Sequence, residues 1–270
     1  MVWRKQVNVR LARRTGMQLR QREGRLRLVR NPRRELTQPA FILSSVRSGS
    51  TLLRLILNSH PQIYAPHELH LAHIKVELGI PAAEHAMTAL NMDKQELTHM
   101  LWDRLLNEAL RRSGKSVLVE KTPNLVFIWH RVASCWPDAR YIYLLRHPAA
   151  ILDSWQRARP TQTPEEAIAS VTRYLTALRE ARGVLPGHTV RYEDLTADPE
   201  RTAKGLCAYL GVDWVPEMIE YGKHEHGELR SGLGDWTENI RTGAVQPAKP
   251  LPDSALPAQL RALAADLGYR

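Results

Sequence analysis

Short apolar runs alternate with stretches of helical spacing along most of this 270-residue chain. Four runs carry the β-branched and aromatic residues that favour strands, and each ends in polar residues or proline: residues 40–46, 116–122, 139–145 and 188–192. Between the runs, apolar residues recur at intervals of three and four, which indicates amphipathic helices. Strands that alternate with helices predict an α/β fold whose parallel sheet has right-handed crossovers.

The first strand and the residues after it form the stretch around which the chain is organised. Residues 40–46 form a mostly apolar run, residues 47–51 read Arg-Ser-Gly-Ser-Thr, and residues 52–57 are too densely apolar for a strand. This order predicts a buried strand, a tight loop and a helix N-terminus. Free N–H groups there attract an anion, and small residues let it come close. The loop is therefore a candidate anion site, and a capped turn without a ligand is the alternative.

The loop does not match a nucleoside-triphosphate P-loop, which would read G-x-x-x-x-G-K-[ST]. No lysine stands directly before Ser50, and no glycine stands five residues before Gly49. The loop resembles instead the 5′-phosphosulfate loop of sulfotransferases, in which a basic residue and S-G-[ST]-T follow a strand. Those enzymes use 3′-phosphoadenosine 5′-phosphosulfate (PAPS). The resemblance implies a P-loop-like sulfotransferase fold and donor contacts from Arg47, Ser48, Gly49, Ser50, Thr51 and Leu52.

A second strand end repeats this arrangement. Residues 139–145 lead to Arg146, and Pro148 stands in the first turn of the next predicted helix. Ser154 follows two helical turns later, so both side chains are expected on one face. Sulfotransferases bind the 3′-phosphate with an arginine and a serine at this spacing, which implies that role for Arg146 and Ser154. A guanidinium suits a dianionic phosphate because it can donate two parallel hydrogen bonds.

Sulfuryl transfer to a hydroxyl requires a base close to the donor. Sulfotransferases of the tyrosylprotein, glycosaminoglycan and polyketide-associated types carry a glutamate in the loop after an H-P pair, and here that residue is Glu68. His67 and His70 are the alternative bases. Glu68 could instead neutralise the first turn of a helix that the pattern predicts from about residue 68.

The end of the second predicted strand also bears on the base. Cytosolic sulfotransferases carry K-T-H there, with the histidine as base, whereas this chain has Lys121, Thr122 and Pro123. Proline cannot accept a proton, which favours Glu68. Ligands in open α/β sheets lie outside the carboxyl ends of the strands, so Lys121 is expected beside the phosphosulfate. An exposed lysine at a strand end is the alternative.

Two later segments resemble the same family. The pattern Y-E-D-L, then D-P and L-G, is typical of sulfotransferases, whose tyrosine at this place lies near the adenine; this implies that role for Tyr192, with a core position as the alternative. Residues 230–236 resemble the R-K-G-x-x-G-x-W loop that closes over the 3′-phosphate. Serine stands in place of the lysine, and one residue fewer separates the glycines. The expected phosphate contacts are Arg230, Ser231 and Gly232.

The charge of the chain is concentrated at its start. The net charge is +10, and residues 1–36 hold twelve basic and two acidic residues, so the remainder is formally neutral. We expect a basic arm over residues 1–36, folded in part as a helix and an extended segment, and one sulfotransferase domain over residues 37–270. Such an arm could attract nucleic acid, an anionic membrane or an acidic partner protein, or it could simply cross the surface.

The remaining features narrow the function. Helical spacing over residues 81–113 predicts a helical cap over the acceptor side. Cys135 and Cys207 are expected as buried free thiols, and the lack of a long apolar run predicts a cytoplasmic protein without a membrane span.

The resemblance thus implies an enzyme that moves a sulfuryl group from PAPS, without a metal, to a hydroxyl of a small-molecule or carrier-bound acceptor. By analogy, the setting would be bacterial secondary metabolism. A P-loop kinase and a protein that binds nucleic acid through residues 1–36 are the alternatives.

Overall fold

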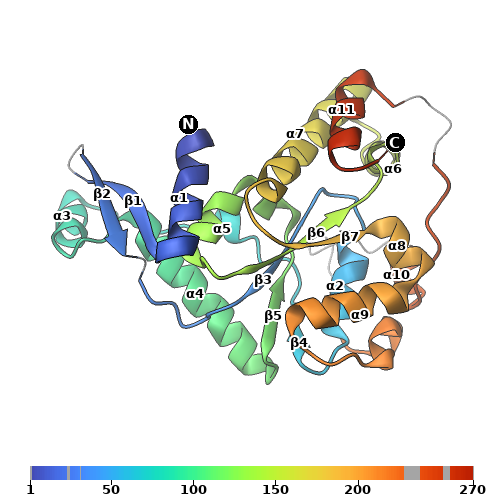
Figure 1. The fold of residues 1–270 in the computed structure, drawn as a ribbon, viewed down its shortest axis with the longest axis horizontal. Helices are drawn as coiled ribbons and strands as arrows, with labels where there is room; N and C mark the ends of the chain where they lie inside the picture. The colour runs from blue at the N-terminus through green and yellow to red at the C-terminus, as the bar shows by residue number, and fades with distance from the viewer. Residues whose placement is uncertain (1, 23–24, 31, 228–237, 252–255, 270) are drawn as a thin grey trace.

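A five-stranded parallel sheet lies at the centre of the protein, in the order β4-β5-β3-β6-β7 (Figure 1). The computed structural model describes residues 2–22, 25–30, 32–227, 238–251 and 256–269. The strands are β3 (Ala40–Ser44), β4 (Ile63–Tyr64), β5 (Val117–Glu120), β6 (Arg140–Leu145) and β7 (His188–Arg191). The predicted parallel α/β sheet is confirmed, with β4 as an additional, two-residue edge strand. Because all five strands run parallel, their carboxyl ends meet at one edge.

Helices cover both faces of the sheet, which explains why the central strand is apolar throughout. All of β3 is buried. Ile42 packs with residues of α2 (Ser50–Asn58) and α9 (Pro199–Leu210), while Phe41 and Leu43 pack with residues of α5 (Trp129–Cys135) and α7 (Pro164–Arg182). A strand buried on both faces reads as a continuous apolar run and not as an alternating one. Cys135 and Cys207 are buried free thiols, as predicted.

Local signals in the sequence set the ends of several helices. Thr163 Oγ1 accepts a hydrogen bond from the backbone N–H of Glu166 (3.2 Å), and Glu166 Oε2 accepts one from the backbone N–H of Thr163 (2.9 Å), so α7 begins at the predicted cap. Further helices in the described part of the chain after β6 are α6 (Pro148–Ala158), α8 (Tyr192–Ala197), α10 (Glu238–Arg241) and α11 (Ala258–Asp266). Short 3₁₀ turns are η1 (Leu71–His73), η2 (Pro123–Phe127), η3 (Pro216–Ile219) and η4 (Tyr221–Lys223).

The prediction of a helix from about Glu68 is wrong. His70 has φ 51°, in the left-handed region, and only η1 follows it before an irregular segment that runs to residue 80. A right-handed helix cannot continue through a left-handed residue. Helices begin later, at α3 (Pro81–Ala89) and α4 (Lys94–Ser113). Glu68 therefore does not neutralise the first turn of a helix.

The first 36 residues contain a helix and a hairpin. Helix α1 (Val2–Thr15) precedes the antiparallel strands β1 (Met17–Arg22) and β2 (Arg25–Arg30). The helix was expected, whereas the pairing of the extended segment into a hairpin was not. Val9 is buried in the same core cluster as Phe41 of the sheet, and Arg13 Nη1 donates to the carbonyl of Ala139 at 3.4 Å. The predicted boundary between arm and domain at residue 36 stays a prediction.

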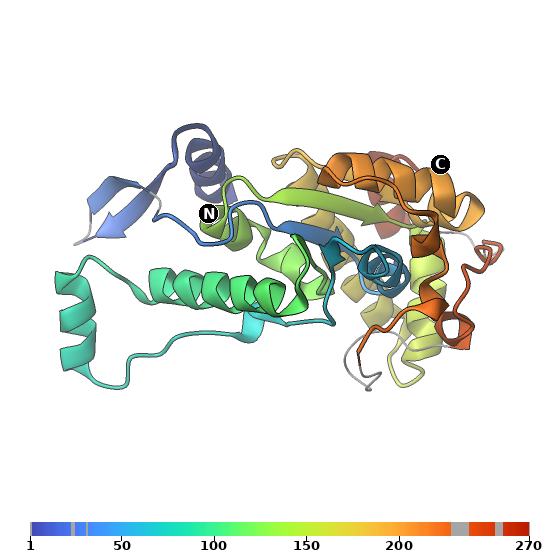
Figure 2. The ribbon, with the colours of Figure 1, turned by 90° about the horizontal axis from the view of Figure 1, so that it is seen from below.

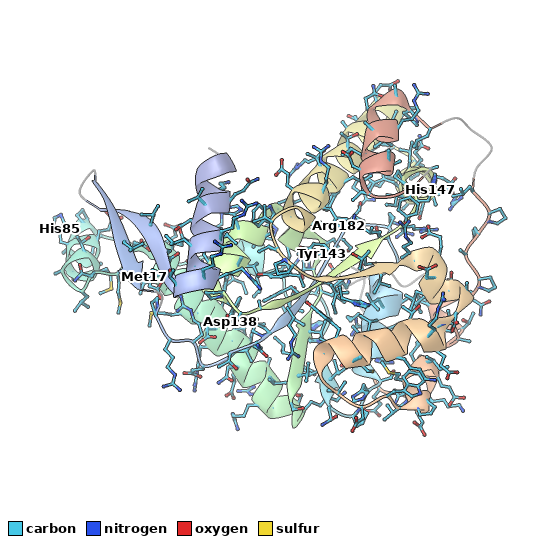
Figure 3. The ribbon with its side chains drawn as sticks, viewed as in Figure 1. Met17, His85, Asp138, Tyr143, His147 and Arg182 are labelled. Carbon is cyan, nitrogen blue, oxygen red and sulfur yellow. The ribbon has the colours of Figure 1, made fainter. Side chains whose placement is uncertain are left out.

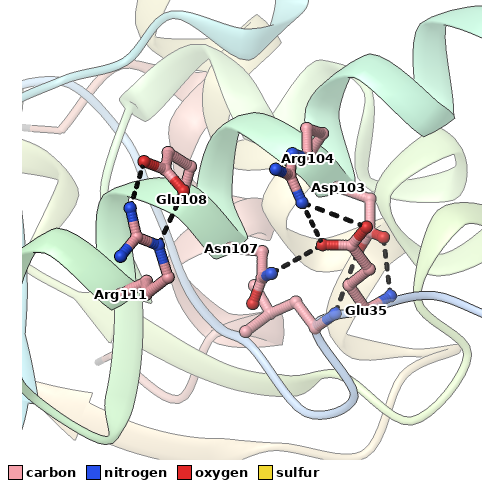
Figure 4. Close-up of polar contacts among 7 residues, drawn as sticks. Glu35, Asp103, Arg104, Asn107, Glu108 and Arg111 are labelled. Carbon is pink, nitrogen blue, oxygen red and sulfur yellow. Dashed lines mark hydrogen bonds and ion pairs between the residues drawn. The ribbon is translucent and has the colours of Figure 1, made fainter.

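A buried carboxylate on α4 fixes the end of this N-terminal segment (Figure 4). Asp103 accepts hydrogen bonds from the backbone N–H groups of Glu35 (2.7 Å) and Leu36 (3.2 Å), and from Trp136 Nε1 (2.9 Å). The Glu35 carboxylate is exposed and accepts from Arg104 Nη1 at 3.0 Å. Because three N–H donors satisfy the buried charge, Asp103 ties the entry to β3 firmly to α4.

One end of the molecule projects away from the sheet (Figures 1 and 2). It contains the β1–β2 hairpin and α3, and α4 runs from α3 back to the sheet. Figure 3 shows Met17 and His85 at this end, with Tyr143 in the sheet and His147 beyond the carboxyl end of β6. No residue of α3 is buried. The helices of residues 81–113 are confirmed, and their role as a cap over the acceptor stays a prediction.

Candidate active site

The loop between β3 and α2 has the geometry of an anion cradle. Gly49 has φ 86°, and a Cβ at this position would lie 2.3 Å from a ring carbon of Tyr192. Glycine is therefore needed both for the backbone conformation and for the close approach of the tyrosine ring. Arg47 also has a left-handed backbone, with φ 69°. Helix α2 begins directly at Ser50, so its N-terminal N–H groups face the loop.

One hydroxyl of the loop is buried without a partner. Ser48 is 1% exposed, and no described residue hydrogen-bonds to its Oγ. A buried hydroxyl without a hydrogen bond is costly, and such groups commonly contact a ligand or a water molecule. An anion seated at the N-terminus of α2 would suit this orphaned donor.

The two arginine-bearing strand ends meet at this loop. Arg47 Nε donates to Ser154 Oγ at 3.0 Å, and Arg146 Nη1 donates to the backbone carbonyl of Arg47 at 2.8 Å. The Arg146 guanidinium lies 4.4 Å from the centre of the Tyr192 ring. Burial lowers the pKa of Arg146, opposed by Tyr192 and Glu193, yet a guanidinium remains charged at neutral pH. Four residues singled out in the sequence thus lie in direct contact.

A cavity of about 590 Å³ connects these groups. Residues predicted from the sequence line it: Arg47, Gly49, Ser50, Thr51, Leu52, Arg146, Ser154 and Tyr192. The other lining residues were not predicted from the sequence; they are Arg157, Ala158, Tyr221, Ile240, Ala244, Gln246, Pro247 and Lys249. Of these, Arg157 stood one turn after Ser154 on the same predicted helix, which was an available signal.

The predicted base lies outside the lining of this cavity, at the end of β5. Glu68 Oε1 accepts a short hydrogen bond from Lys121 Nζ, and Glu68 Oε2 lies 3.7 Å from His70 Nε2. The Lys121 side chain is 1% exposed, so Lys121 is not a surface lysine. Burial lowers the pKa of Lys121, and the charge of Glu68 opposes this shift. A buried lysine in contact with a carboxylate is expected to form an ion pair.

A second carboxylate supports the loop that carries Glu68. Glu120 is fully buried; its Oε1 accepts from Thr122 Oγ1 (2.6 Å) and from the backbone N–H of Leu69 (3.4 Å). Thr122 Oγ1 in turn accepts from the backbone N–H of His70 at 3.2 Å. Burial raises the pKa of Glu120 to about 7. Glu120 was not predicted as a site residue, although a glutamate at the end of an apolar strand is a visible signal in the sequence.

Arg54 is the second cation near the base. It is 1% exposed on α2, and its Nη1 donates to the carbonyl of Ala65 at 3.1 Å. Burial lowers the pKa of Arg54 to about 10, and Glu68 opposes the shift. Partial burial and the Arg54 charge lower the pKa of His67, so this histidine is neutral at neutral pH. Arg54 was missed because it stands within an apolar helical run.

The remaining predictions concern the C-terminal phosphate contacts, metal ions and membrane spans. Arg230, Ser231 and Gly232 lie outside the described residues. Within the described part of the chain, no group of three histidine, cysteine, aspartate or glutamate side chains could hold a metal ion. None of the helices that the structure describes combines the length and the apolar character of a membrane span.

Comparison with known proteins identifies the family of the chain. Residues 39–216 match a family described as the sulfotransferase family. Nodulation protein NoeE of Sinorhizobium fredii (strain NBRC 101917 / NGR234) is 31% identical over 232 residues, which cover 72% of this chain and 55% of that protein. Protein-tyrosine sulfotransferase 1 of Danio rerio is 23% identical over 234 residues, covering 80% of this chain and 64% of that protein. The chain thus spans only part of each of these relatives.

Solved structures share the fold. The sulfotransferase domain from the Synechococcus PCC 7002 olefin synthase has a TM-score of 0.59 and 25% identity, covering 89% of this chain and 98% of that domain. The sulfotransferase domain from the curacin biosynthetic pathway has a TM-score of 0.62 at 23% identity, covering 87% and 99%. The family match over residues 39–216 shows that the chain belongs to the sulfotransferase family.

Proposed function

We propose that the protein transfers a sulfuryl group from PAPS to a hydroxyl of a small-molecule or carrier-bound acceptor. The observation that carries this proposal is that Arg47 and Arg146, from two separate strand ends, line one cavity of about 590 Å³. A donor with phosphate groups at its 5′ and 3′ positions requires two such cationic sites in one continuous space.

The cavity residues divide between the two ends of the donor. Arg47 and the N–H groups at the start of α2 hold the 5′-phosphosulfate, with the orphaned Ser48 hydroxyl beside them. Arg146 and Ser154 hold the 3′-phosphate. The Tyr192 ring lies close to both Gly49 and the Arg146 guanidinium and contributes an aromatic surface for the adenine. Arg230, Ser231 and Gly232 complete the 3′-phosphate site in this proposal.

The proposed reaction is a direct, in-line displacement. Glu68 takes the proton of the acceptor hydroxyl, preferably at Oε2, because Oε1 already accepts a hydrogen bond from Lys121. The acceptor oxygen forms a bond to sulfur, and the bond from sulfur to the bridging 5′-phosphate oxygen breaks. The electron pair of that bond remains on the departing phosphate, whose charge Arg47, Lys121 and the loop N–H groups stabilise. His67 and His70 are the rival bases.

The proposed acceptor class and setting follow from similar proteins. NoeE is described as a nodulation protein, and one structural neighbour is a domain of an olefin synthase. A hydroxyl on a small molecule or on a carrier-bound chain, in bacterial secondary metabolism, is consistent with both. The twelve basic residues within the first 36 would suit an acidic partner protein such as a carrier. The proposed reaction needs no metal, since Arg47 and Lys121 neutralise the departing phosphate.

Calorimetric titration with 3′-phosphoadenosine 5′-phosphate (PAP) and with ATP tests the donor. We expect PAP to bind and ATP to bind far more weakly. Arg146→Met should weaken PAP binding at least about tenfold, because a charge-assisted contact with phosphate is lost. Arg104→Met, an exposed arginine on α4 outside the cavity, is the matched control. Equal affinity for ATP would favour the kinase alternative, and absence of PAP binding would refute the proposal.

A further inference from the structure

The wall of the donor cavity contains a lysine that no family pattern predicted. Lys249 lines the cavity together with Arg47, Arg146 and Arg157. It stands beyond α10, in the segment that leads toward α11. In the sequence it is the first lysine after Lys223. The C-terminal part of the chain thus brings a fourth cation to a space that is bordered mainly by strand ends and α6.

Lys249 differs from the other cations of the cavity in its contacts. Arg47 and Arg146 donate to Ser154 Oγ and to a backbone carbonyl, and Arg157 forms an ion pair with Asp153 at 2.5 Å. For Lys249, no described residue provides a hydrogen bond or an ion pair, and the side chain is exposed. An ammonium that borders a cavity without a protein partner is available to an anionic ligand.

The position of the segment indicates which end of the donor Lys249 serves. After α10 the chain rises along the side of the molecule toward α6 and α11, and both views place it beside α6 (Figures 1 and 2). Arg157 and Ala158 of α6 line the cavity with Lys249, and Ser154 precedes Arg157 by one helical turn. The segment that carries Lys249 therefore lies on the side of the molecule formed by α6, the helix that carries Ser154.

A difference between this sequence and the related loop pattern suggests a role for Lys249. The loop over residues 230–236 carries Ser231 where the related pattern has a lysine, so one positive charge is missing there. We propose that Lys249, together with Arg157, binds the 3′-phosphate of the donor and supplies the ammonium that position 231 lacks. This inference rests on the proposed function, because it presupposes a donor with a 3′-phosphate.

The test compares two nucleotides that differ only in the 3′-phosphate, PAP and 5′-AMP, by calorimetry on the full chain. Lys249→Met should weaken PAP binding about tenfold, as expected for the loss of a charge-assisted hydrogen bond, and should leave 5′-AMP binding unchanged. Lys249→Arg should retain most of the PAP affinity. Lys223→Met is the matched control, since this exposed lysine pairs with Glu220 at 2.9 Å and lies outside the cavity.

Each other outcome contradicts the role of Lys249, its assignment to the 3′-phosphate or the proposed function. If Lys249→Met leaves PAP affinity unchanged while the wild-type protein binds PAP, the inference fails and the proposed function stands. If the variant weakens PAP and 5′-AMP equally, Lys249 contacts the 5′ end and the assignment to the 3′-phosphate is wrong. If the wild-type protein does not bind PAP at all, the proposed function itself fails.

Discussion

Two polar clusters at the carboxyl edge of the sheet use their charges differently. At β3 and β6, Arg47 and Arg146 donate to neutral acceptors and line an open cavity of about 590 Å³. At the neighbouring strand β5, Lys121 is 1% exposed and binds the carboxylate of Glu68, outside the cavity lining. The first cluster faces space for an external anion, whereas the second already contains both charges of an ion pair.

In the proposed function, the cluster at β3 and β6 binds the donor, whereas the cluster at β5 takes part in the reaction. A preformed cationic cavity can attract the donor without rearrangement, because its charges are already oriented. In the proposed reaction, Lys121 stabilises the departing phosphate, so it has to share its hydrogen bonds between Glu68 and the donor. Glu68 Oε2, which does not bind Lys121, accepts the proton in this reaction. Substitutions in either cluster test this division.

Replacement of the proposed base should have the largest effect. Glu68→Gln is expected to lower turnover at least about 100-fold, because an amide cannot accept the proton of the acceptor hydroxyl. PAP affinity should stay close to that of the wild-type protein, since Glu68 lies outside the cavity lining. Transfer of labelled sulfuryl from PAPS and calorimetry with PAP measure the two quantities separately.

The neighbouring histidines provide the matched controls. His70→Gln and His67→Gln should each retain turnover within a few-fold of the wild type. Near-normal turnover of Glu68→Gln, together with a large loss in one histidine variant, would assign the base to that histidine. A large loss of PAP affinity in Glu68→Gln would show that the two clusters are not separate.

Removal of Lys121 should reduce stability more than removal of a surface lysine. Lys121→Met leaves the Glu68 carboxylate, only 13% exposed, without its ion-pair partner, which is expected to cost about 3 kcal/mol of unfolding free energy. Lys94→Met removes an exposed ion pair with Glu84 (2.8 Å), and its effect should be small. Urea denaturation measures both. Equal losses in the two variants would contradict the description of the β5 cluster as a buried pair.

The cluster at β3 and β6 was largely predictable from the sequence, because its signals are local. The loop over residues 47–51 and the pair Arg146 and Ser154 are each defined by a strand end and the helix that follows. Parallel strands then bring separate strand ends to one edge, so the meeting of Arg47 and Arg146 follows from the fold. Lys249 reaches the same cavity only through the path of the C-terminal segment, which no local pattern encodes.

The cluster at β5 was less predictable, because tertiary hydrogen bonds determine its backbone. Residues after Glu68 have a pattern that favours a helix, yet Glu120 and Thr122 bind the backbone N–H groups of Leu69 and His70. These bonds hold the segment in an irregular path, with His70 in the left-handed region. Contacts over about fifty residues of sequence, as between Leu69 and Glu120, outweigh local propensity here.

Glu120 should give the β5 cluster a distinct pH dependence. Its pKa rises on burial from 4.5 to about 7, so the folded state retains a proton that the unfolded state releases. The contribution of Glu120 to stability is therefore fully present below pH 4.5 and falls as pH rises toward 7. Between pH 5 and pH 7 the loss amounts to about 2 kcal/mol. Glu120→Gln stays neutral and should not show this loss.

Urea denaturation of the wild-type protein and Glu120→Gln at several pH values checks this prediction. The stability of the variant relative to the wild type should rise from pH 5 to pH 7, while other carboxylates contribute equally to both proteins. Glu35→Gln, which replaces an exposed carboxylate, serves as the control. A constant difference between Glu120→Gln and the wild type would show that Glu120 titrates normally.

The smallest expected effect concerns backbone strain in the loop between β3 and α2. Arg47 has φ 69°, and a left-handed backbone at a residue other than glycine costs about 1 kcal/mol or more. Arg47→Gly and Arg47→Ala both remove the guanidinium, so both should weaken PAP binding by the same factor. Arg47→Gly should nevertheless be about 1 kcal/mol more stable than Arg47→Ala, because glycine adopts this conformation without strain. If the alanine variant is at least as stable, the backbone at position 47 is not strained. Any effect of Arg47 on the free energy of unfolding then comes from its guanidinium contacts alone.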